Sequence, residues 1–184
     1  MVKFSIYRAD ITKLKVEAIV NAANESGLGC SIPGHCIDNA IHYAAGSELL
    51  EECKTLGGVP TGVAKITKAY NLPSKYIIHV TGPRKTKEGK LDWSKLAESY
   101  VSCLKLAKQY KIREIAFCCV STGLFGFPKR ESAELAIQTI LEWISKEEHN
   151  LDSIIFDVFT YEDHSIYQEL LDNHKIEYDS LSIV

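Results

Sequence analysis

Val20-Asn-Ala-Ala-Asn24, continuing as Glu25-Ser-Gly-Leu-Gly-Cys-Ser-Ile-Pro-Gly-His-Cys-Ile-Asp38, is the stretch that decides the fold. An apolar run at 18–20 breaks off into two asparagines, and a loop with three glycines, a proline, two cysteines and a histidine follows. An amphipathic pattern resumes at Ile37. A strand, a polar loop and a helix start in this order are typical of the place where an α/β protein binds a phosphate-bearing ligand.

Composition predicts one ordinary globular domain over residues 1–184. Hydrophobic residues make up 46% of the chain and charged residues 24%, and 184 residues are enough to bury a core. The net charge of -3 gives no electrostatic case for non-specific nucleic-acid binding. It still allows an anionic ligand, because backbone N–H groups at a helix start hold phosphate without net positive charge.

The chain carries no pattern of a targeting or membrane segment. The N-terminus alternates like a strand and lacks the apolar core of a signal peptide, and no apolar run approaches membrane-spanning length. The six cysteines contain no Cys-x-x-Cys and are interpreted as reduced thiols. A cytoplasmic protein without membrane contact is therefore expected.

Hydrophobic periodicity predicts alternating strands and helices over most of the chain. Strands are expected at 4–9, 16–20, 63–70, 76–81, 114–120 and 153–159, and helices at 37–54, 92–108, 131–145 and 163–173. This order favours a mainly parallel or mixed sheet with helices on both faces. The first two strands have no helix between them, so an antiparallel pairing at one edge is expected. The strand at 114–120 is the most apolar and is expected near the centre.

A second candidate loop is Ser121-Thr-Gly-Leu-Phe-Gly-Phe-Pro128, which follows a buried strand and precedes a helix. Gly123 and Gly126 lack a Cβ, so their amides can approach a pyrophosphate closely. The alternative is a simple strand-to-helix turn. The loop lacks the Gly-Lys-Ser/Thr ending of a Walker A motif.

Polar side chains cluster where the strands are expected to end. Asn21 and Asn24 can both donate and accept, which suits ribose hydroxyls, although asparagine also caps turns. Asp38 near the same edge favours a site. Asp10 could accept a hydrogen bond from an amino group such as adenine N6, or it could form an Asx-turn.

These motifs together resemble the macrodomain family. The resemblance is carried by Asp10-Ile-Thr12, Ala18-Ile-Val-Asn-Ala-Ala-Asn24, Ile37-Asp-Asn-Ala-Ile-His42, Pro60-Thr-Gly62, Tyr76-Ile-Ile-His-Val-Thr-Gly-Pro83 and the 121–128 loop, in order along nearly the whole chain. It implies a three-layer α/β/α fold with a mixed, mainly parallel central sheet and a cleft for ADP-ribose.

The family pattern also implies roles for individual residues. Asp10 and Ile11 would meet the adenine, with Phe159 packing near it, and Asn24 would contact the distal ribose. The diphosphate and distal ribose would be wrapped by Ser121, Thr122, Gly123, Leu124, Phe125 and Gly126. In the similar MacroD-type branch, Asn21, Asn24 and Asp38 match residues tied to catalysis, and Asp38 would orient or activate a water for attack at the anomeric carbon.

The resemblance implies a hydrolase that removes mono-ADP-ribosyl groups from proteins. Its partners would be ADP-ribose and mono-ADP-ribosylated protein. Two alternatives stay open: a reader module that binds ADP-ribose without turnover, and an O-acetyl-ADP-ribose deacetylase that uses the same residues. Asp38 favours an enzyme, because binding alone does not require that carboxylate.

The middle of the 21–38 stretch departs from the common macrodomain pattern. It resembles a microbial branch that holds a catalytic zinc with Cys-x4-His-x-Cys, but here Cys36 follows His35 directly, one residue short. Cys30, His35 and Cys36 would be three ligands with an open fourth position, as in a catalytic zinc site. The alternative is that Cys36 packs at the helix start while Cys30 and His35 are loop residues. His42 and His79 are interpreted as packing or supporting residues.

Overall fold

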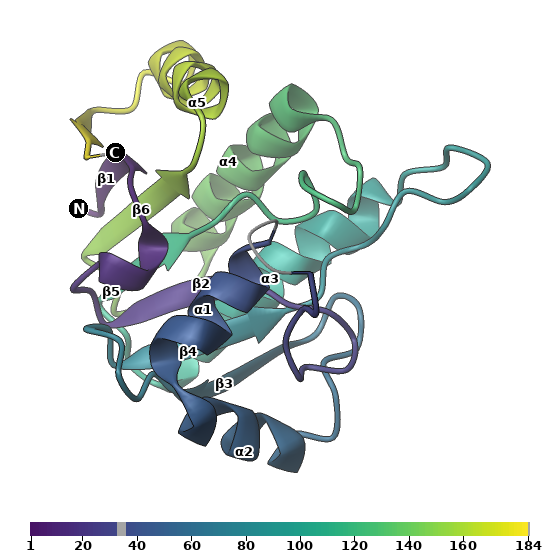
Figure 1. The fold of residues 1–184 in the computed structure, drawn as a ribbon. Coiled ribbons are helices and arrows are strands. Elements are labelled where there is room, and N and C mark those ends of the chain that lie inside the picture. Colours follow the sequence, from purple (N-terminus) through teal and green to yellow (C-terminus); the bar gives the residue numbers. More distant parts are fainter. Residues whose placement is uncertain (33–35, 184) are drawn as a thin grey trace.

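A computed structural model describes residues 1–32 and 36–183, in which a seven-stranded sheet lies between two layers of helices (Figure 1). The strands are β1 (Lys3–Arg8), β2 (Ala18–Ala22), β3 (Ala64–Lys68), β4 (Tyr76–Val80), β5 (Glu114–Phe117), β6 (Ser153–Val158) and β7 (Tyr178–Ser182). The helices are η1 (Ile11–Lys13), α1 (Ile37–Ala45), α2 (Ser47–Thr55), α3 (Trp93–Gln109), α4 (Lys129–Lys146) and α5 (Tyr161–Asn173).

The sheet has the order β3-β4-β2-β5-β6-β1-β7, and its neighbours are parallel except for the antiparallel pair β3 and β4. The expectation of a mixed, mainly parallel sheet with 114–120 near its centre is confirmed. The expected antiparallel pairing of the first two strands is wrong, because β5 and β6 separate β2 from β1. Strand β1 instead pairs with β6 and β7 in parallel, which are contacts between distant parts of the sequence.

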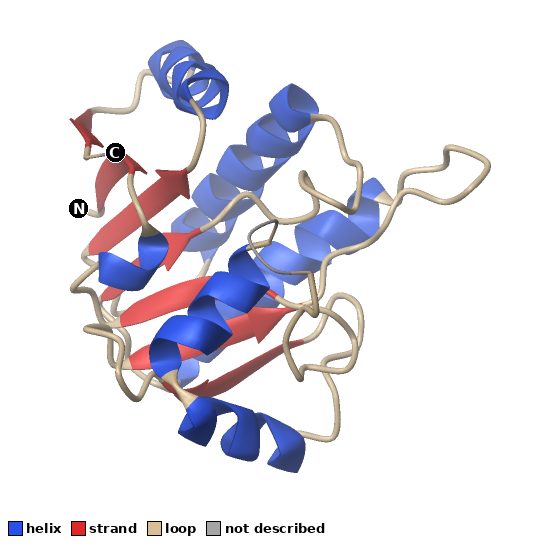
Figure 2. Cartoon of the chain, in the orientation of Figure 1, coloured by secondary structure: helices blue, strands red, loops and turns tan. Residues whose placement is uncertain are grey.

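The helices form the outer layers of a three-layer α/β/α fold. Helices α1 and α2 lie in front of the sheet in Figure 2, whereas α3 and α4 lie behind it and α5 packs beside α4 and the β1–β6 side of the sheet. Each long helix turns a buried apolar stripe toward the sheet, as Leu96, Tyr100 and Leu104 do in α3. Asp92 accepts a hydrogen bond from the backbone N–H of Lys95, which caps the start of that helix.

The single helix expected over 37–54 is in fact two helices, which meet at Gly46. Gly46 has a φ of 90°, and a Cβ at this position would lie 2.7 Å from Asn71 Nδ2. The positive φ disfavours any residue with a side chain here, whereas the Asn71 amide is the end of an exposed side chain that could move aside. The break lets α2 turn to pack against β3 while α1 stays against β2.

The parallel strands bring the candidate residues to one edge of the sheet. Strands β4, β2, β5, β6 and β1 all run in the same direction, so the segments after their C-terminal ends lie along a common edge. Ligands of open α/β sheets bind outside these carboxyl ends. This edge is where the expected site residues are brought together.

Candidate active site

The centre of the site is a buried pair formed by Asn21 at the end of β2 and Asp38 in the first turn of α1. Asn21 Nδ2 donates a hydrogen bond of 2.7 Å to Asp38 Oδ1. Asn21 is fully buried and Asp38 is 2% exposed. Asn21 Oδ1 and Asp38 Oδ2 have no hydrogen-bond partner, so each presents a free acceptor. Because buried polar groups are almost always paired, two free acceptors on one hydrogen-bonded pair indicate a place for a ligand or water.

His42 lies one turn after Asp38 on α1 and completes this centre. Its Nε2 is 3.5 Å from Asp38 Oδ1, a close contact without hydrogen-bond geometry. Burial raises the pKa of Asp38, while the hydrogen bond from Asn21 and the neighbouring His42 act in the opposite direction. Burial lowers the pKa of His42, and the charge of Asp38 opposes that change. The sequence analysis interpreted His42 as a packing or supporting residue, and the structure places it beside Asp38 through their i, i+4 spacing on α1.

Asn24 is held inside the loop that follows β2. Its Nδ2 donates to the carbonyl of Gly29 at 3.0 Å, and its Oδ1 accepts from the backbone N–H of Ser26 at 3.1 Å and from the Ser26 hydroxyl. Gly29, with a φ of 92°, lies against the His42 ring, where a Cβ would come within 3.3 Å. Asn24 thus shapes the loop beside the Asn21–Asp38 pair, and its contact with a ribose stays a prediction.

Two of the three expected zinc ligands lie within the described residues. Cys36 is the half-buried N-cap residue of α1, and burial, followed by a hydrogen bond with the Cys30 thiol, raises its pKa to about 11. Asn39 Nδ2 donates to the Cys30 carbonyl at 3.1 Å, which ties Cys30 to α1. The two thiols are therefore neighbours, as a shared metal requires. The third expected ligand, His35, lies outside the described residues.

The loop after β5, residues 121–128, is closed at its base by a hydrogen bond and exposed to solvent at its tip. Ser121 has a φ of 66°, and its carbonyl accepts a hydrogen bond of 3.0 Å from the backbone of Phe127, which closes the loop at its base. Phe125 is half-buried beneath the guanidinium of Arg84, 4.3 Å from its ring centre. Thr122 is half-buried, and the residues exposed at the tip are Gly123, Leu124 and Gly126.

The opposite end of the edge carries Asp10, Ile11 and Phe159. Asp10 Oδ1 accepts from the backbone N–H and hydroxyl of Thr12 at 3.0 and 2.7 Å, which is an Asx-type turn, while Ile11 is buried. Phe159 follows β6 and is 77% exposed, so its ring is accessible for stacking on a ligand.

Asp157, near the end of β6, is a buried carboxyl that the sequence interpretation did not single out. Its Oδ1 has no hydrogen-bond partner, and burial followed by the charge of Asp10 raises its pKa to about 8. The signal in the sequence was a charged residue inside an otherwise apolar strand. Asp157 therefore adds a second carboxyl group near Asp10 at this end of the sheet edge.

The strand order sets the sequence of these groups along the edge. Asp10 and Phe159 follow the adjacent strands β1 and β6, the 121–126 loop follows β5, and the Asn21–Asp38 pair lies at the end of β2. The arrangement therefore has Phe159 with two carboxyl groups at one end, a glycine-rich middle, and the Asn21–Asp38 pair at the other end. Such an order suits an elongated ligand with a base, a diphosphate and a sugar.

Comparison with known proteins assigns the class. Residues 20–136 match the Macro domain family, and the chain therefore belongs to that family. Human ADP-ribose glycohydrolase MACROD2 is 50% identical over 170 residues, which are 91% of this chain and 39% of that protein. The protein-ADP-ribose hydrolase of Staphylococcus aureus is 45% identical over 172 residues, which are 89% of this chain and 64% of that protein.

A solved structure agrees with the fold. A macrodomain mutant from Oceanobacillus iheyensis with ADPR superposes with a TM-score of 0.82 at 38% identity, covering 92% of this chain and 92% of that one. The three-layer macrodomain fold expected from the sequence is thus confirmed. The chain spans well under two thirds of the length of MACROD2 and just under two thirds of the staphylococcal protein. Among the described helices, none has the length and apolar character needed to cross a membrane.

Proposed function

We propose that this chain binds ADP-ribose and hydrolyses mono-ADP-ribosyl groups from protein side chains. The observation that carries the proposal is the buried Asn21–Asp38 pair with its free carboxylate oxygen, at the carboxyl ends of the strands. The names of the curated relatives, an ADP-ribose glycohydrolase and a protein-ADP-ribose hydrolase, support the same activity.

The order of groups along the edge supports one orientation for the ligand. Adenine would lie against Phe159, with its amino group toward the Asp10 carboxylate. The diphosphate would meet the backbone amides of the 121–126 loop, where the exposed glycines allow close approach. The distal ribose would then reach the Asn21–Asp38 pair, and Asn24 in the adjacent loop would contact its hydroxyls.

In this orientation Asp38 acts as the general base. Its Oδ2 would accept a proton from a water as the water oxygen forms a bond to the anomeric carbon of the distal ribose. The bond from that carbon to the protein side-chain oxygen breaks, and the released carboxylate or alkoxide takes up a proton, so that free ADP-ribose and unmodified protein result. Asn21 holds Oδ1 through its hydrogen bond and leaves Oδ2 without a partner.

We also propose that Cys30, His35 and Cys36 hold a zinc ion in the loop between β2 and α1. The contact between the Cys30 and Cys36 thiols supports this proposal, since thiolate and imidazole are the ligands zinc prefers. A bound zinc would supply Lewis-acid polarisation of a substrate or water oxygen. Asp38 and Asn21 keep the roles given above.

The alternative is a reader that binds ADP-ribose without turnover. A reader needs no buried carboxylate with a free oxygen, since burying a charge is costly and adds nothing to neutral hydroxyl recognition. Incubation with a mono-ADP-ribosylated protein distinguishes the two. We expect loss of the label and release of ADP-ribose, whereas a label that persists at enzyme excess, with and without added zinc, overturns the hydrolase proposal.

A cytoplasmic location is part of the same proposal. All six cysteines are free thiols, which a reducing compartment maintains. Fractionation of the source cells with an antibody to the chain tests it, and recovery in an oxidising compartment contradicts it.

A further inference from the structure

We propose that His79 is a positioning residue that sets the orientation of the Asn21 amide and, through it, of the Asp38 carboxylate. The inference rests on the proposed function only in taking Asp38 as the general base. His79 lies in β4, next to Asn21 in β2, and the two residues are paired in the register of these parallel strands. Both side chains are completely buried.

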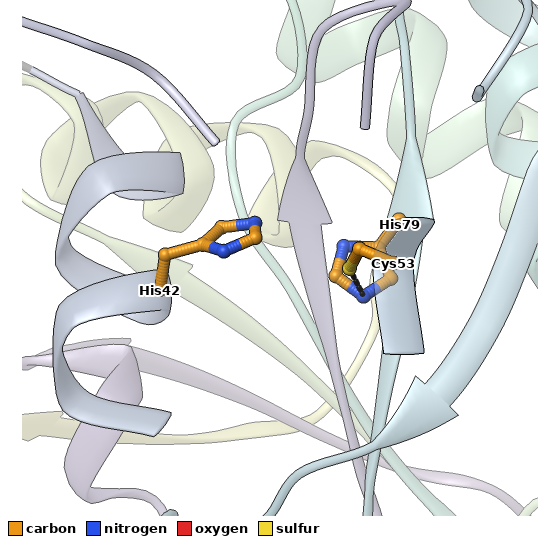
Figure 3. A group of neighbouring side chains, drawn as sticks. All are labelled: His42, Cys53 and His79. Carbon is orange, nitrogen blue, oxygen red and sulfur yellow. Dashed lines mark hydrogen bonds between the residues drawn. The ribbon is translucent and has the colours of Figure 1, made fainter. Parts of the chain in front are cut away.

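The imidazole of His79 has contacts at both ring nitrogens. Nδ1 lies 3.1 Å from Asn21 Nδ2, and Nε2 lies 2.9 Å from Thr67 Oγ1 on the neighbouring strand β3. The Cys53 thiol from α2 lies 3.9 Å from Nε2 (Figure 3). A line of contacts thus runs from β3 through His79 and Asn21 to Asp38.

These contacts define the tautomer of His79. Asn21 Nδ2 donates to Asp38 Oδ1, and its second hydrogen is directed to His79 Nδ1, so Nδ1 must be an unprotonated acceptor. Nε2 then carries the proton and donates to Thr67 Oγ1. An imidazolium would place two N–H donors against each other, and burial together with the nearby His42 lowers the pKa of His79 to about 3. The ring is therefore neutral.

The Asp38 carboxylate and this tautomer of His79 together favour one orientation of the Asn21 amide. If the amide were rotated by 180°, Oδ1 would face the unprotonated Nδ1 and the Asp38 carboxylate, which are both acceptors. In the observed orientation Oδ1 is the free acceptor, as is Asp38 Oδ2. His79 thus orients the Asp38 carboxylate through Asn21 without touching the substrate itself. Buried hydrogen-bond partners orient metal-ligating histidines in the same way.

The same region suggests a metal site, because donor atoms of His42, Cys53 and His79 all lie within 4.8 Å of one another (Figure 3). The hydrogen bonds argue against it. Both nitrogens of His79 are engaged with Asn21 and Thr67, so a metal would have to displace one of them.

The test compares three variants with the wild-type protein in single-turnover removal of ADP-ribose from a modified protein. His79→Leu fills the space but cannot accept a hydrogen bond, and we expect kcat to fall about 100-fold, within the range of general-base effects. The Kd for ADP-ribose should change by less than about 3-fold, because only the transition-state interaction is lost. His79→Asn can place Oδ1 where Nδ1 stood and should recover most of this loss. Cys53→Ala, on the other side of the ring, should keep wild-type kcat.

A nitrogen-resolved NMR spectrum of the wild-type histidines gives a second readout independent of turnover. We expect His79 to show an unprotonated Nδ1 and a protonated Nε2 from pH 5 to 8. The opposite tautomer, full kcat in His79→Leu, or equal loss in His79→Leu, His79→Asn and Cys53→Ala overturns the inference. If the wild-type protein itself removes no label, the proposed function fails, and the tautomer measurement still decides the orientation of Asn21.

Discussion

Asn21 Nδ2 lies 2.7 Å from Asp38 Oδ1, which joins the end of a central strand to the first turn of the helix that follows the site loop. The two residues are separated by seventeen positions in the sequence. The pair leaves one free oxygen on each side chain. It is the structural feature from which the proposed chemistry follows.

If Asn21 acts through Asp38, the losses of kcat caused by substituting Asn21 and Asp38 are not additive. Asn21→Ala leaves Asp38 Oδ1 and His79 Nδ1 without their donor, and we expect it to lower kcat and to cost about 1–3 kcal/mol in the free energy of unfolding. The double variant with Asp38→Ala should be no slower than Asp38→Ala alone. Asn150→Ala, an exposed asparagine before β6, is the matched control. Additive losses in kcat would contradict the coupling.

Phe159 should contribute to ligand binding without contributing to stability. Its ring is 77% exposed, so Phe159→Ala should change the free energy of unfolding by no more than about 0.5 kcal/mol. Stacking on a base is worth about 1–3 kcal/mol, which predicts a Kd for ADP-ribose at least about 5-fold weaker by calorimetry. Tyr43→Ala, an equally exposed aromatic on α1, should bind as the wild type does. Unchanged affinity in Phe159→Ala would place the base elsewhere.

The lowered pKa of His79 predicts that the free energy of unfolding falls in mild acid. Its pKa is about 3 in the folded chain, against about 6.5 for an unperturbed histidine, so between these values the unfolded chain binds the extra proton. The free energy of unfolding should therefore fall as the pH drops below about 6.5, by up to about 1.4 kcal/mol per pH unit from this group. The contribution is constant above that pH.

Urea unfolding of the wild type and His79→Leu between pH 4 and pH 8 measures this contribution. The variant should show a shallower dependence on pH in this window, whatever its stability at pH 8. Parallel curves for the two proteins would mean that His79 is not held neutral in the folded chain.

Zinc in the loop between β2 and α1 is tested by metal analysis of the purified protein. We expect about one zinc per chain, from three ligands with an open fourth position. Cys30→Ala should lose it, whereas Cys53→Ala should retain it, because Cys53 belongs to the separate group with His42 and His79. Absence of zinc from the wild type, or its loss in Cys53→Ala and not in Cys30→Ala, would contradict the assignment.

The sequence pattern was sufficient for the architecture but not for every pairing. Apolar runs followed by turn residues located the strands, and their alternation with helices predicted the parallel sheet. The position of β1 between β6 and β7 depends on contacts across some 150 to 175 residues, for which no local pattern exists. The break at Gly46 was missed because the apolar periodicity continues through it, although Gly46 leaves the helical conformation with a φ of 90°.

The candidate site was predictable where it follows strand ends. Asn21 and Asp38 could be placed near each other because one ends a strand and the other begins the next helix. The contact of Asn21 with His79 was not predicted, since His79 comes from a different strand and lies in an apolar pattern. The place of His42 beside Asp38 follows from their i, i+4 spacing on one helix. For Asn24 the sequence did not predict the contacts within the loop. Its amide nitrogen donates to Gly29 and its amide oxygen accepts from Ser26, and its contact with a ribose stays a prediction.

The most direct test of the central claim is removal of ADP-ribose from a mono-ADP-ribosylated protein by the wild type and by Asp38→Ala. We expect the wild type to release ADP-ribose and Asp38→Ala to be slower by about 100-fold or more, since a positioned base contributes about 10²–10⁴-fold. Its Kd for ADP-ribose should stay within about 3-fold of wild type, and Asp152→Asn, an exposed carboxylate before β6, should be fully active. Undiminished turnover in Asp38→Ala, or loss of ADP-ribose binding as its only effect, would contradict the account.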